Sequence, residues 1–228
     1  MDELLYIGQS NNLRRRILEL RGAIQDSEMP WNDPHVAAAR FWALLQNARH
    51  DFEISVARTS DDVIARKSLE SLAISLYRAE SGRSPKFNFG RMPDGWFPSS
   101  RRSKGNRGGF DPDITYSPHQ DSIFSDQSDP TSADWLGLTW QPPDKLEPST
   151  AISGVYRAFA LDRQSVVYIG ESKDLGSRIA THASNFEATW EYAPLDHADH
   201  AQRLEIENDL IASHVAAVGV PPARQFQS

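Results

Sequence analysis

Hydrophobic and polar positions in the last third of the chain predict a small α+β unit. Residues 154–161 and 165–170 are rich in β-branched and aromatic side chains, and the polar residues between them predict a hairpin. Ser172 then predicts the N-cap of a helix. Residues 189–193 are a third predicted strand, and residues 198–215 have the apolar spacing of a second helix.

The same order of elements is expected near the N-terminus, because two segments repeat. Residues 4–17 match residues 166–179, with seven of fourteen positions identical. A second match pairs residues 66–74 with residues 203–211. The offsets are 162 and 137 residues, so the first copy has about 25 extra residues between its two blocks, including a helix-like run over 35–47.

We therefore expect an α+β fold with two small domains, each a three-stranded, antiparallel sheet flanked by helices. The first copy shows strand patterns at residues 4–8 and 52–57 and helix patterns from Ser10 and from about residue 60. It lacks the first strand of the second copy, which leaves a sheet edge to be covered. Residues 136–140 are our candidate for that cover.

Composition predicts a first domain over residues 1–92, a linker over 93–150 and a second domain over 151–228. The linker is rich in Pro and Ser, and it is basic at its start and acidic afterwards. The chain has no cysteine, which excludes disulfides and Cys-ligated zinc. Its apolar runs are too short for a membrane span and no secretory signal is present, so we expect a cytoplasmic protein without membrane contact.

The formal net charge is −7, which argues against nucleic-acid binding. That total hides an asymmetry, because residues 1–110 carry +4 and the remainder −11. Candidates for contact with nucleic-acid phosphates lie in the first predicted helix and in the basic loop, and they are Arg14, Arg15, Arg16, Arg101, Arg102, Lys104 and Arg107. The alternative is a solvated charged face.

Several polar residues share helix faces with apolar ones in the second copy. On the last helix Arg203 and Glu207 fall within the apolar arc, and the ordinary interpretation is an i,i+4 ion pair. Arg178 and His182 share a face with Leu175 in the same way. By themselves they would be a salt-bridging arginine and a hydrogen-bonded core histidine.

Taken together, these residues resemble the GIY-YIG nuclease family. Gly154-Val155-Tyr156 is followed after eleven residues by Tyr168-Ile169-Gly170, and then by Arg178, His182 and Glu207 at the family spacing. The resemblance covers residues 152–223 and, in degraded form, residues 4–89. In place of the family's usual asparagine the second copy has Arg224 at the expected position.

The resemblance implies a metal-dependent endonuclease of restriction or defence type that hydrolyses DNA phosphodiester bonds, with RNA left open as a substrate. Glu207 would hold Mg²⁺ or Mn²⁺, Arg178 would bind the scissile phosphate, and Tyr156 or Tyr168 would deprotonate the attacking water with help from His182. One site per chain implies a homodimer or larger assembly for cutting both strands.

The first copy looks degenerate. It keeps Tyr6, Arg16, Glu70 and Asn88 as a vestigial site, but it has Leu20 where the family histidine would stand. The alternative function is therefore a catalytically silent nuclease fold that binds DNA or a protein partner.

Overall fold

The computed structural model describes residues 3–33, 35–47, 51–146 and 151–227. Within these ranges the chain has five α-helices and two small antiparallel sheets, so the predicted α+β class is confirmed. Packing divides the chain into one unit of Met1–Arg66 with Pro85–Pro118 and a second unit of Lys67–Ser84 with His119–Ser228. This division differs from the predicted one, because the described residues of the predicted linker belong to the two units.

The sheet of the second unit has three strands. They are β3 (Gly154–Phe159), β4 (Val166–Ser172) and β5 (Thr189–Pro194). Their order is β4-β3-β5, with both pairings antiparallel, as the predicted hairpin and third strand require. The strand that comes first in the sequence is therefore central, and both other strands depend on it for their ladders.

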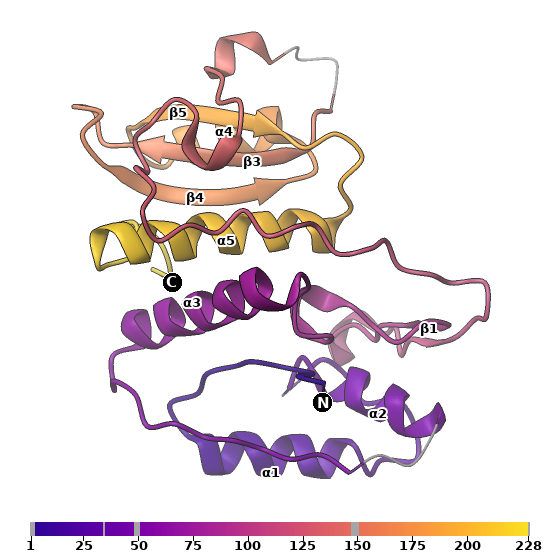
Figure 1. Ribbon diagram of the computed structural model, residues 1–228. Helices are drawn as coiled ribbons and strands as arrows, with labels where there is room; N and C mark the ends of the chain where they lie inside the picture. The colour runs from indigo at the N-terminus through magenta and orange to yellow at the C-terminus, as the bar shows by residue number, and fades with distance from the viewer. Residues whose placement is uncertain (1–2, 34, 48–50, 147–150, 228) are drawn as a thin grey trace. The chain divides into compact units, whose positions relative to one another are not determined.

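Two helices cover opposite faces of this sheet, because successive residues of a strand point to opposite sides. Helix α5 (His200–Val218) lies along one face of the sheet (Figure 1). Its residues Ile206 and Leu210 pack with Val155 and Ile169. Helix α4 (Leu175–Ala183) covers the other face, where Leu175 and Ile179 meet aromatic residues of the strands. Its N-cap is Asp174, whose side chain accepts the N–H of Ser177, and not the expected Ser172.

Both edges of the sheet are occupied. On the β5 edge Gln141 pairs with Tyr192, and on the β4 edge the carbonyl of Val167 accepts the N–H of Arg224 at 2.8 Å. Leu136 and Trp140 pack on the core of this unit. The prediction that residues 136–140 cover a sheet in the first copy was therefore wrong, since this segment covers the sheet of the second.

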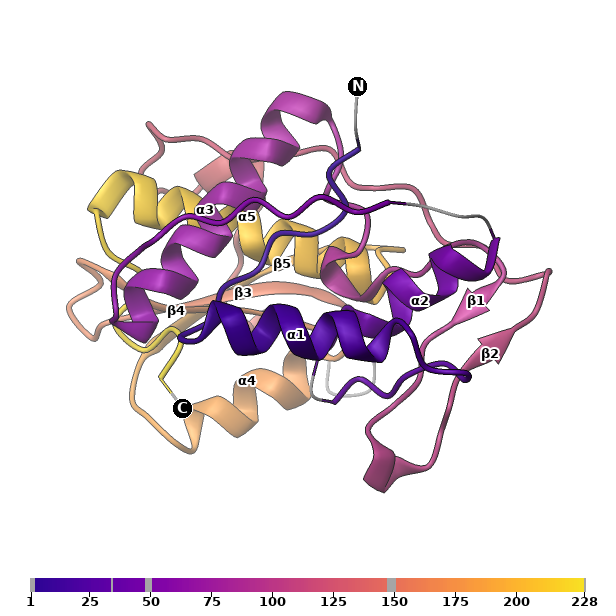
Figure 2. The same ribbon diagram turned by 90° about the horizontal axis from the view of Figure 1, so that it is seen from below.

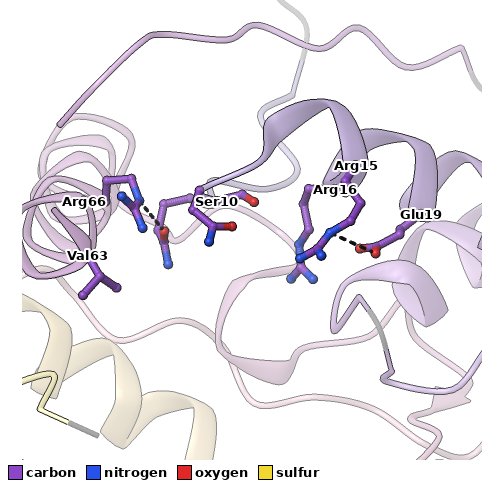
Figure 3. A pocket seen from close by; sticks show the side chains of 8 residues that line it. Ser10, Arg15, Arg16, Glu19, Val63 and Arg66 are labelled. Carbon is purple, nitrogen blue, oxygen red and sulfur yellow. Dashed lines mark hydrogen bonds and ion pairs between the residues drawn. The ribbon is translucent and has the colours of Figure 1, made fainter. Parts of the chain in front are cut away.

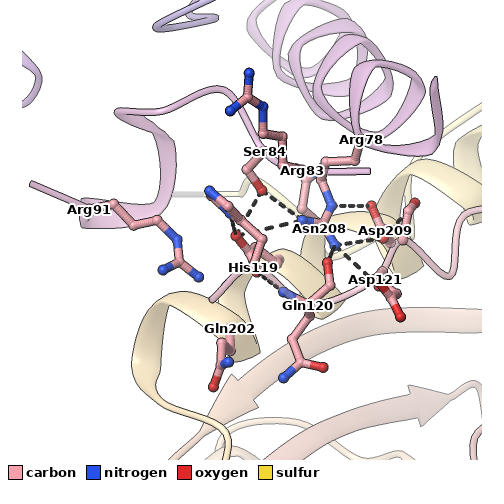
Figure 4. A network of polar contacts seen from close by, with 12 residues as sticks. Arg78, Arg83, Ser84, Arg91, His119, Gln120, Asp121, Gln202, Asn208 and Asp209 are labelled. Carbon is pink, nitrogen blue, oxygen red and sulfur yellow. Dashed lines mark hydrogen bonds and ion pairs between the residues drawn. The ribbon is translucent and has the colours of Figure 1, made fainter. Parts of the chain in front are cut away.

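A buried ionic network joins α5 to α3 (Val63–Ser81) (Figure 4). The Arg78 guanidinium, fully shielded from solvent, lies 3.1 Å from Asp209 and 3.6 Å from Glu205, two carboxylates that are equally shielded. Ser84 links the same groups, accepting from Arg78 at 2.6 Å and donating to Glu205 at 2.9 Å. The residues from His119 to Ile123 close the network, with His119 Nδ1 at 2.5 Å from Glu205 and the Ile123 N–H donating to Asp209.

The first unit has no counterpart of this three-stranded sheet in its described residues, so the prediction for the first copy was wrong. Its helices are α1 (Leu13–Ala23) and α2 (Ala38–Asn47), and its strands are the short β1 (Trp96–Phe97) and β2 (Gly109–Phe110) (Figure 2). Residues 4–8 and 52–57 form no strand.

The reason is the missing central strand. In the second unit the equivalents of both segments are strands that pair with the central β3, and the described residues of the first unit contain no strand in its place. Residues 4–8 bond to residues 86–88. The expected helix over residues 35–47 fills the core instead. Phe41 of α2 packs with Leu5, Tyr6, Phe52 and Phe87.

None of the helices in the described ranges combines the length and the apolar character that crossing a membrane requires.

We predict that Arg78→Leu lowers the free energy of unfolding by about 3–5 kcal/mol, because Glu205 and Asp209 would remain buried without a cation. Urea unfolding followed by circular dichroism measures this change, with the exposed Arg58→Leu as control. Adding Glu205→Gln and Asp209→Asn to Arg78→Leu should recover part of the loss. A loss equal to that of Arg58→Leu would show that the network contributes nothing.

Candidate active site

Two tyrosines from adjacent strands stand on the α4 face of the sheet. Tyr156 is 1% exposed, Tyr168 is half-buried, and their ring centroids lie 6.0 Å apart. Burial raises the pKa of both phenols, and their close approach raises that of Tyr156 further. Gly170 makes this approach possible, because a Cβ at that position would lie 2.5 Å from the Tyr156 phenol oxygen.

His182 joins the two tyrosines from α4. Its ring centroid lies 5.8 Å from that of Tyr156 and 5.1 Å from that of Tyr168, and the rings of Phe186 and Trp190 flank it. Burial, and to a smaller extent the Arg178 guanidinium, lower the pKa of His182. The imidazole is therefore neutral near pH 7 and half-buried beside the phenols.

Arg178 lies one turn before His182 on α4. Its side chain is exposed, and no carboxylate in the described part of the chain forms an ion pair with it. Its positive charge opposes the rise that burial causes in the pKa of both phenols. Within the described residues the expected alternative of a salt-bridging arginine is not observed, and the guanidinium is exposed to solvent.

Glu207 reaches the same place from α5 and raises the pKa of both phenols. Burial first, and the Glu171 carboxylate second, raise its own pKa to about 8. The expected ion pair with Arg203 was wrong. Arg203 Nε instead donates to Glu171 at 2.8 Å, and His200 lies 3.5 Å from the same carboxylate. The charges of His200 and Arg178 oppose the rise in the pKa of Glu207, and no cation among the described residues forms an ion pair with Glu207.

All five predicted site residues of the second copy are brought together. Tyr156, Tyr168 and His182 are in ring contact, and Arg178 and Glu207 act electrostatically on the phenols. Among the residues that the structure describes, no three His, Asp or Glu side chains cluster as a metal cage. A single carboxylate still fits Mg²⁺, which is usually held by one or two carboxylates with water and phosphate oxygens.

The two copies share hydrogen bonds that the sequence match does not reveal. Helices α3 and α5 are both 19 residues long, their N-cap side chains are Asp62 and Asp199, and both are followed by a glycine with positive φ. A second hydrogen bond is also shared. In the first copy the Phe87 N–H donates to the Leu5 carbonyl, and in the second copy the Arg224 N–H donates to the Val167 carbonyl. The repeat is therefore one of backbone hydrogen bonding as well as of residues.

These contacts correct the position assigned to the missing asparagine. In the first copy the Asn88 carbonyl oxygen accepts the N–H of Ile7 at 3.0 Å. In the second copy the Gln225 carbonyl oxygen accepts the N–H of Ile169 at 3.1 Å. Gln225 is therefore the counterpart of Asn88, and Arg224, whose guanidinium lies 4.4 Å from the Phe186 ring centroid, is not.

The vestigial site of the first copy is only partly assembled within the first unit. Tyr6 and Arg16 lie there with Asn88, whereas Glu70 lies in the part of α3 that belongs to the second unit. An unpredicted histidine joins them, since the His35 ring lies 5.8 Å from that of Tyr6. His35 was missed because it comes from the insertion, which has no counterpart in the second copy.

The predicted nucleic-acid contacts all lie in the first unit. Arg14 and Arg15 are exposed on α1, and Arg16 is half-buried beside them. Arg101, Arg102 and Lys104 are exposed in the loop between β1 and β2. Arg101 lies 3.9 Å from Asp33 in an exposed ion pair. Arg107 pairs with Glu28 and lies over the Trp31 ring at 4.8 Å.

Comparisons of the chain with family models, with curated proteins and with solved structures find no match.

We predict that His35 makes the first unit less stable in acid. Burial, Arg16 and Arg40 lower its pKa from 6.5 to about 4. Since the unfolded chain binds the proton more tightly, stability falls as the pH drops from about 6.5 to about 4, by up to about 3 kcal/mol. His35→Asn keeps an acceptor for the Ala37 N–H, and it should flatten this dependence in urea unfolding at a series of pH values. The exposed His197→Asn is the control, and an equal slope in both variants would contradict the prediction.

Proposed function

We propose that the chain is a metal-dependent endonuclease of the GIY-YIG type that hydrolyses DNA phosphodiester bonds at the site in its second unit. The observation that carries the proposal is the convergence of two phenols, a neutral imidazole, an exposed guanidinium and a buried carboxyl group on one place. These are the groups that phosphodiester hydrolysis needs, namely a proton acceptor, a phosphate clamp and a ligand for a divalent cation.

Each side chain has a role that follows from its surroundings. Arg178 is exposed, so its planar fork can bind the oxygens of a scissile phosphate. Glu207 is the side chain that would hold Mg²⁺ or Mn²⁺. When bound, that ion polarises the phosphate and stabilises the leaving oxygen.

Tyr168 is the better proton acceptor of the two tyrosines. Tyr156 is almost fully buried and Tyr168 only half-buried, so burial favours the protonated form more strongly at Tyr156. Burial raises the pKa of Tyr168 as well, and the charge of Arg178 opposes that rise. We assign proton abstraction from water to Tyr168, its positioning to Tyr156, and packing of both rings to His182.

The second candidate function is a catalytically silent fold that binds DNA or a protein partner. The net charge of −11 beyond residue 110 favours it, because an acidic surface repels a polyanion. Replacement of asparagine by Gln225 does not distinguish the two functions, since Gln225 makes the same bond to the backbone.

We predict that wild-type protein nicks plasmid DNA in Mg²⁺ or Mn²⁺, and that Glu207→Gln lowers the rate at least about 100-fold. Tyr168→Phe should lower it by about 10²–10⁴-fold because the proton acceptor is lost. The exposed Glu187→Gln is a matched control that leaves the rate unchanged. Supercoiled plasmid resolved on gels measures nicking and linearisation.

The thermal unfolding midpoint of Glu207→Gln should stay close to that of wild type, because burial already favours the neutral form of Glu207 near pH 7 and glutamine is a neutral side chain of similar size. Loss of activity at an unchanged midpoint excludes misfolding as its cause. Wild-type activity that survives Glu207→Gln would contradict the assignment, and an inert wild type that still binds DNA would favour the silent fold.

DNA contact on this proposal falls largely to the first unit. Arg102 and Lys104 have no carboxylate partner among the described residues, whereas Arg107 is paired with Glu28. We predict that Arg102→Gln with Lys104→Gln reduces the slope of log affinity against log salt by about 2, while Arg107→Gln changes it little. Fluorescence anisotropy of a labelled duplex measures both slopes. Equal changes per charge removed would show that pairing inside the protein does not matter.

A further inference from the structure

A pocket of about 370 Å³ lies in the first unit between the start of α1 and the first turn of α3 (Figure 3). Its volume is in the range of small-ligand sites. Three arginines line it with one carboxylate, and the principal lining residues are Gln9, Ser10, Arg15, Arg16, Glu19 and Arg66. The pocket is therefore cationic, although the chain as a whole is anionic.

Arg66 is buried in this pocket with only neutral partners. It is 8% exposed, its Nε donates to the Gln9 side-chain oxygen at 3.2 Å, and its Nη1 donates to the carbonyls of Ser60 and Asp61. No carboxylate in the described ranges pairs with it. A buried cation without a counter-ion is costly, and a bound anion would remove that cost.

The second copy shows what the first has lost. Arg203 occupies the place of Arg66, and its Nη1 likewise donates to a backbone carbonyl, that of Ala198. Its Nε, however, donates to the Glu171 carboxylate, whose counterpart in the first copy is Gln9. The exchange of Glu for Gln keeps the hydrogen bond and removes the negative charge, so Arg66 pairs with no carboxylate among the described residues.

The start of α1 is a second feature that favours a bound anion in this pocket. Arg14, Arg15 and Arg16 stand in its first turn, which contains no acidic residue, whereas α4 has Gly176, Ser177 and Arg178 at the matching places. Cations are unfavourable at a helix N-terminus, because the helix dipole is positive there. An anion in the pocket would be attracted by the dipole and the arginines together.

We propose that this pocket binds a phosphate group of a nucleic-acid strand, outside the site that would cut it. Arg66 and Arg15 are the side chains that would reach the phosphate oxygens, since a guanidinium matches them with two parallel hydrogen bonds. Arg15 is 3.5 Å from Glu19 in an exposed pair, which contributes little and is easily exchanged. This phosphate site extends the proposed function and depends on it, because the ligand is taken to be nucleic acid.

The test restores the charge that the second copy has. Gln9→Glu would pair with Arg66 as Glu171 pairs with Arg203, and it should weaken DNA binding about tenfold and make the salt dependence shallower by about 1 phosphate contact. Gln25→Glu adds the same charge at an exposed position beyond α1 and outside the pocket, so it should weaken binding by less than about twofold.

The measurement is fluorescence anisotropy of a labelled DNA duplex and of a single strand with the full chain, in EDTA so that no cleavage occurs. The unfolding midpoint of Gln9→Glu should not fall, because the variant gains an ion pair. Arg15→Gln should weaken binding more than Arg14→Gln, since Arg14 does not line the pocket. Equal affinities for Gln9→Glu and Gln25→Glu would overturn the proposal, and so would a wild type that binds neither DNA.

These outcomes are separable from those of the nuclease assay. If Gln9→Glu loses DNA affinity but wild type never cuts, the pocket stands and the proposed nuclease activity fails. If wild type cuts and Gln9→Glu binds like Gln25→Glu, the activity stands and the pocket proposal fails.

Discussion

The buried guanidinium of Arg78 holds α5 in place, and α5 carries the carboxylate on which the candidate site depends. Each side of this helix has a different task. Ile206 and Leu210 pack against the sheet, Glu205 and Asp209 bind Arg78, and Glu207 points to the tyrosines. Because apolar packing permits small rotations while charged hydrogen bonds do not, the network with Arg78 sets the orientation from which Glu207 reaches the site.

The central strand is the second constraint. In the second unit β3 pairs with both neighbouring strands, so the sheet depends on it. The same strand carries Tyr156, one of the two tyrosines of the candidate site. The first unit has no such strand among its described residues, and it has neither the sheet nor the second phenol. There the Tyr6 ring lies over Gly8 much as the Tyr156 ring lies over Gly170. One change in topology accounts for both losses.

The sequence pattern predicts the second unit well because its signals are local or nearest-neighbour. Two runs of β-branched and aromatic residues predicted the hairpin of β3 and β4. The motif spacing from Tyr156 to Glu207 singled out residues that lie near one another in the structure. Partner choice was less predictable. Arg203 was expected to bind Glu207 one turn away on the same helix. Its Nε instead lies 2.8 Å from the Glu171 carboxylate on β4, a contact between two elements that helix spacing does not predict.

Failures in the first copy have the same origin. Residues 4–8 have the composition of a strand, but within the described ranges the first unit supplies no strand that pairs with them. Asn88 was found from its motif, whereas its counterpart Gln225 became recognisable only through the shared bond to an isoleucine N–H. His35 had no signal, since a histidine in an insertion reveals its neighbours only after folding.

Our central claim is that one copy of a duplicated unit holds DNA while the other cuts it. Cleavage rates with protein in excess over DNA, measured against protein concentration, test this most directly. We predict that Gln9→Glu raises the protein concentration needed for half-maximal rate and leaves the maximal rate unchanged. Glu207→Gln should lower the maximal rate alone. A fall in maximal rate with Gln9→Glu, or an unchanged one with Glu207→Gln, would contradict it.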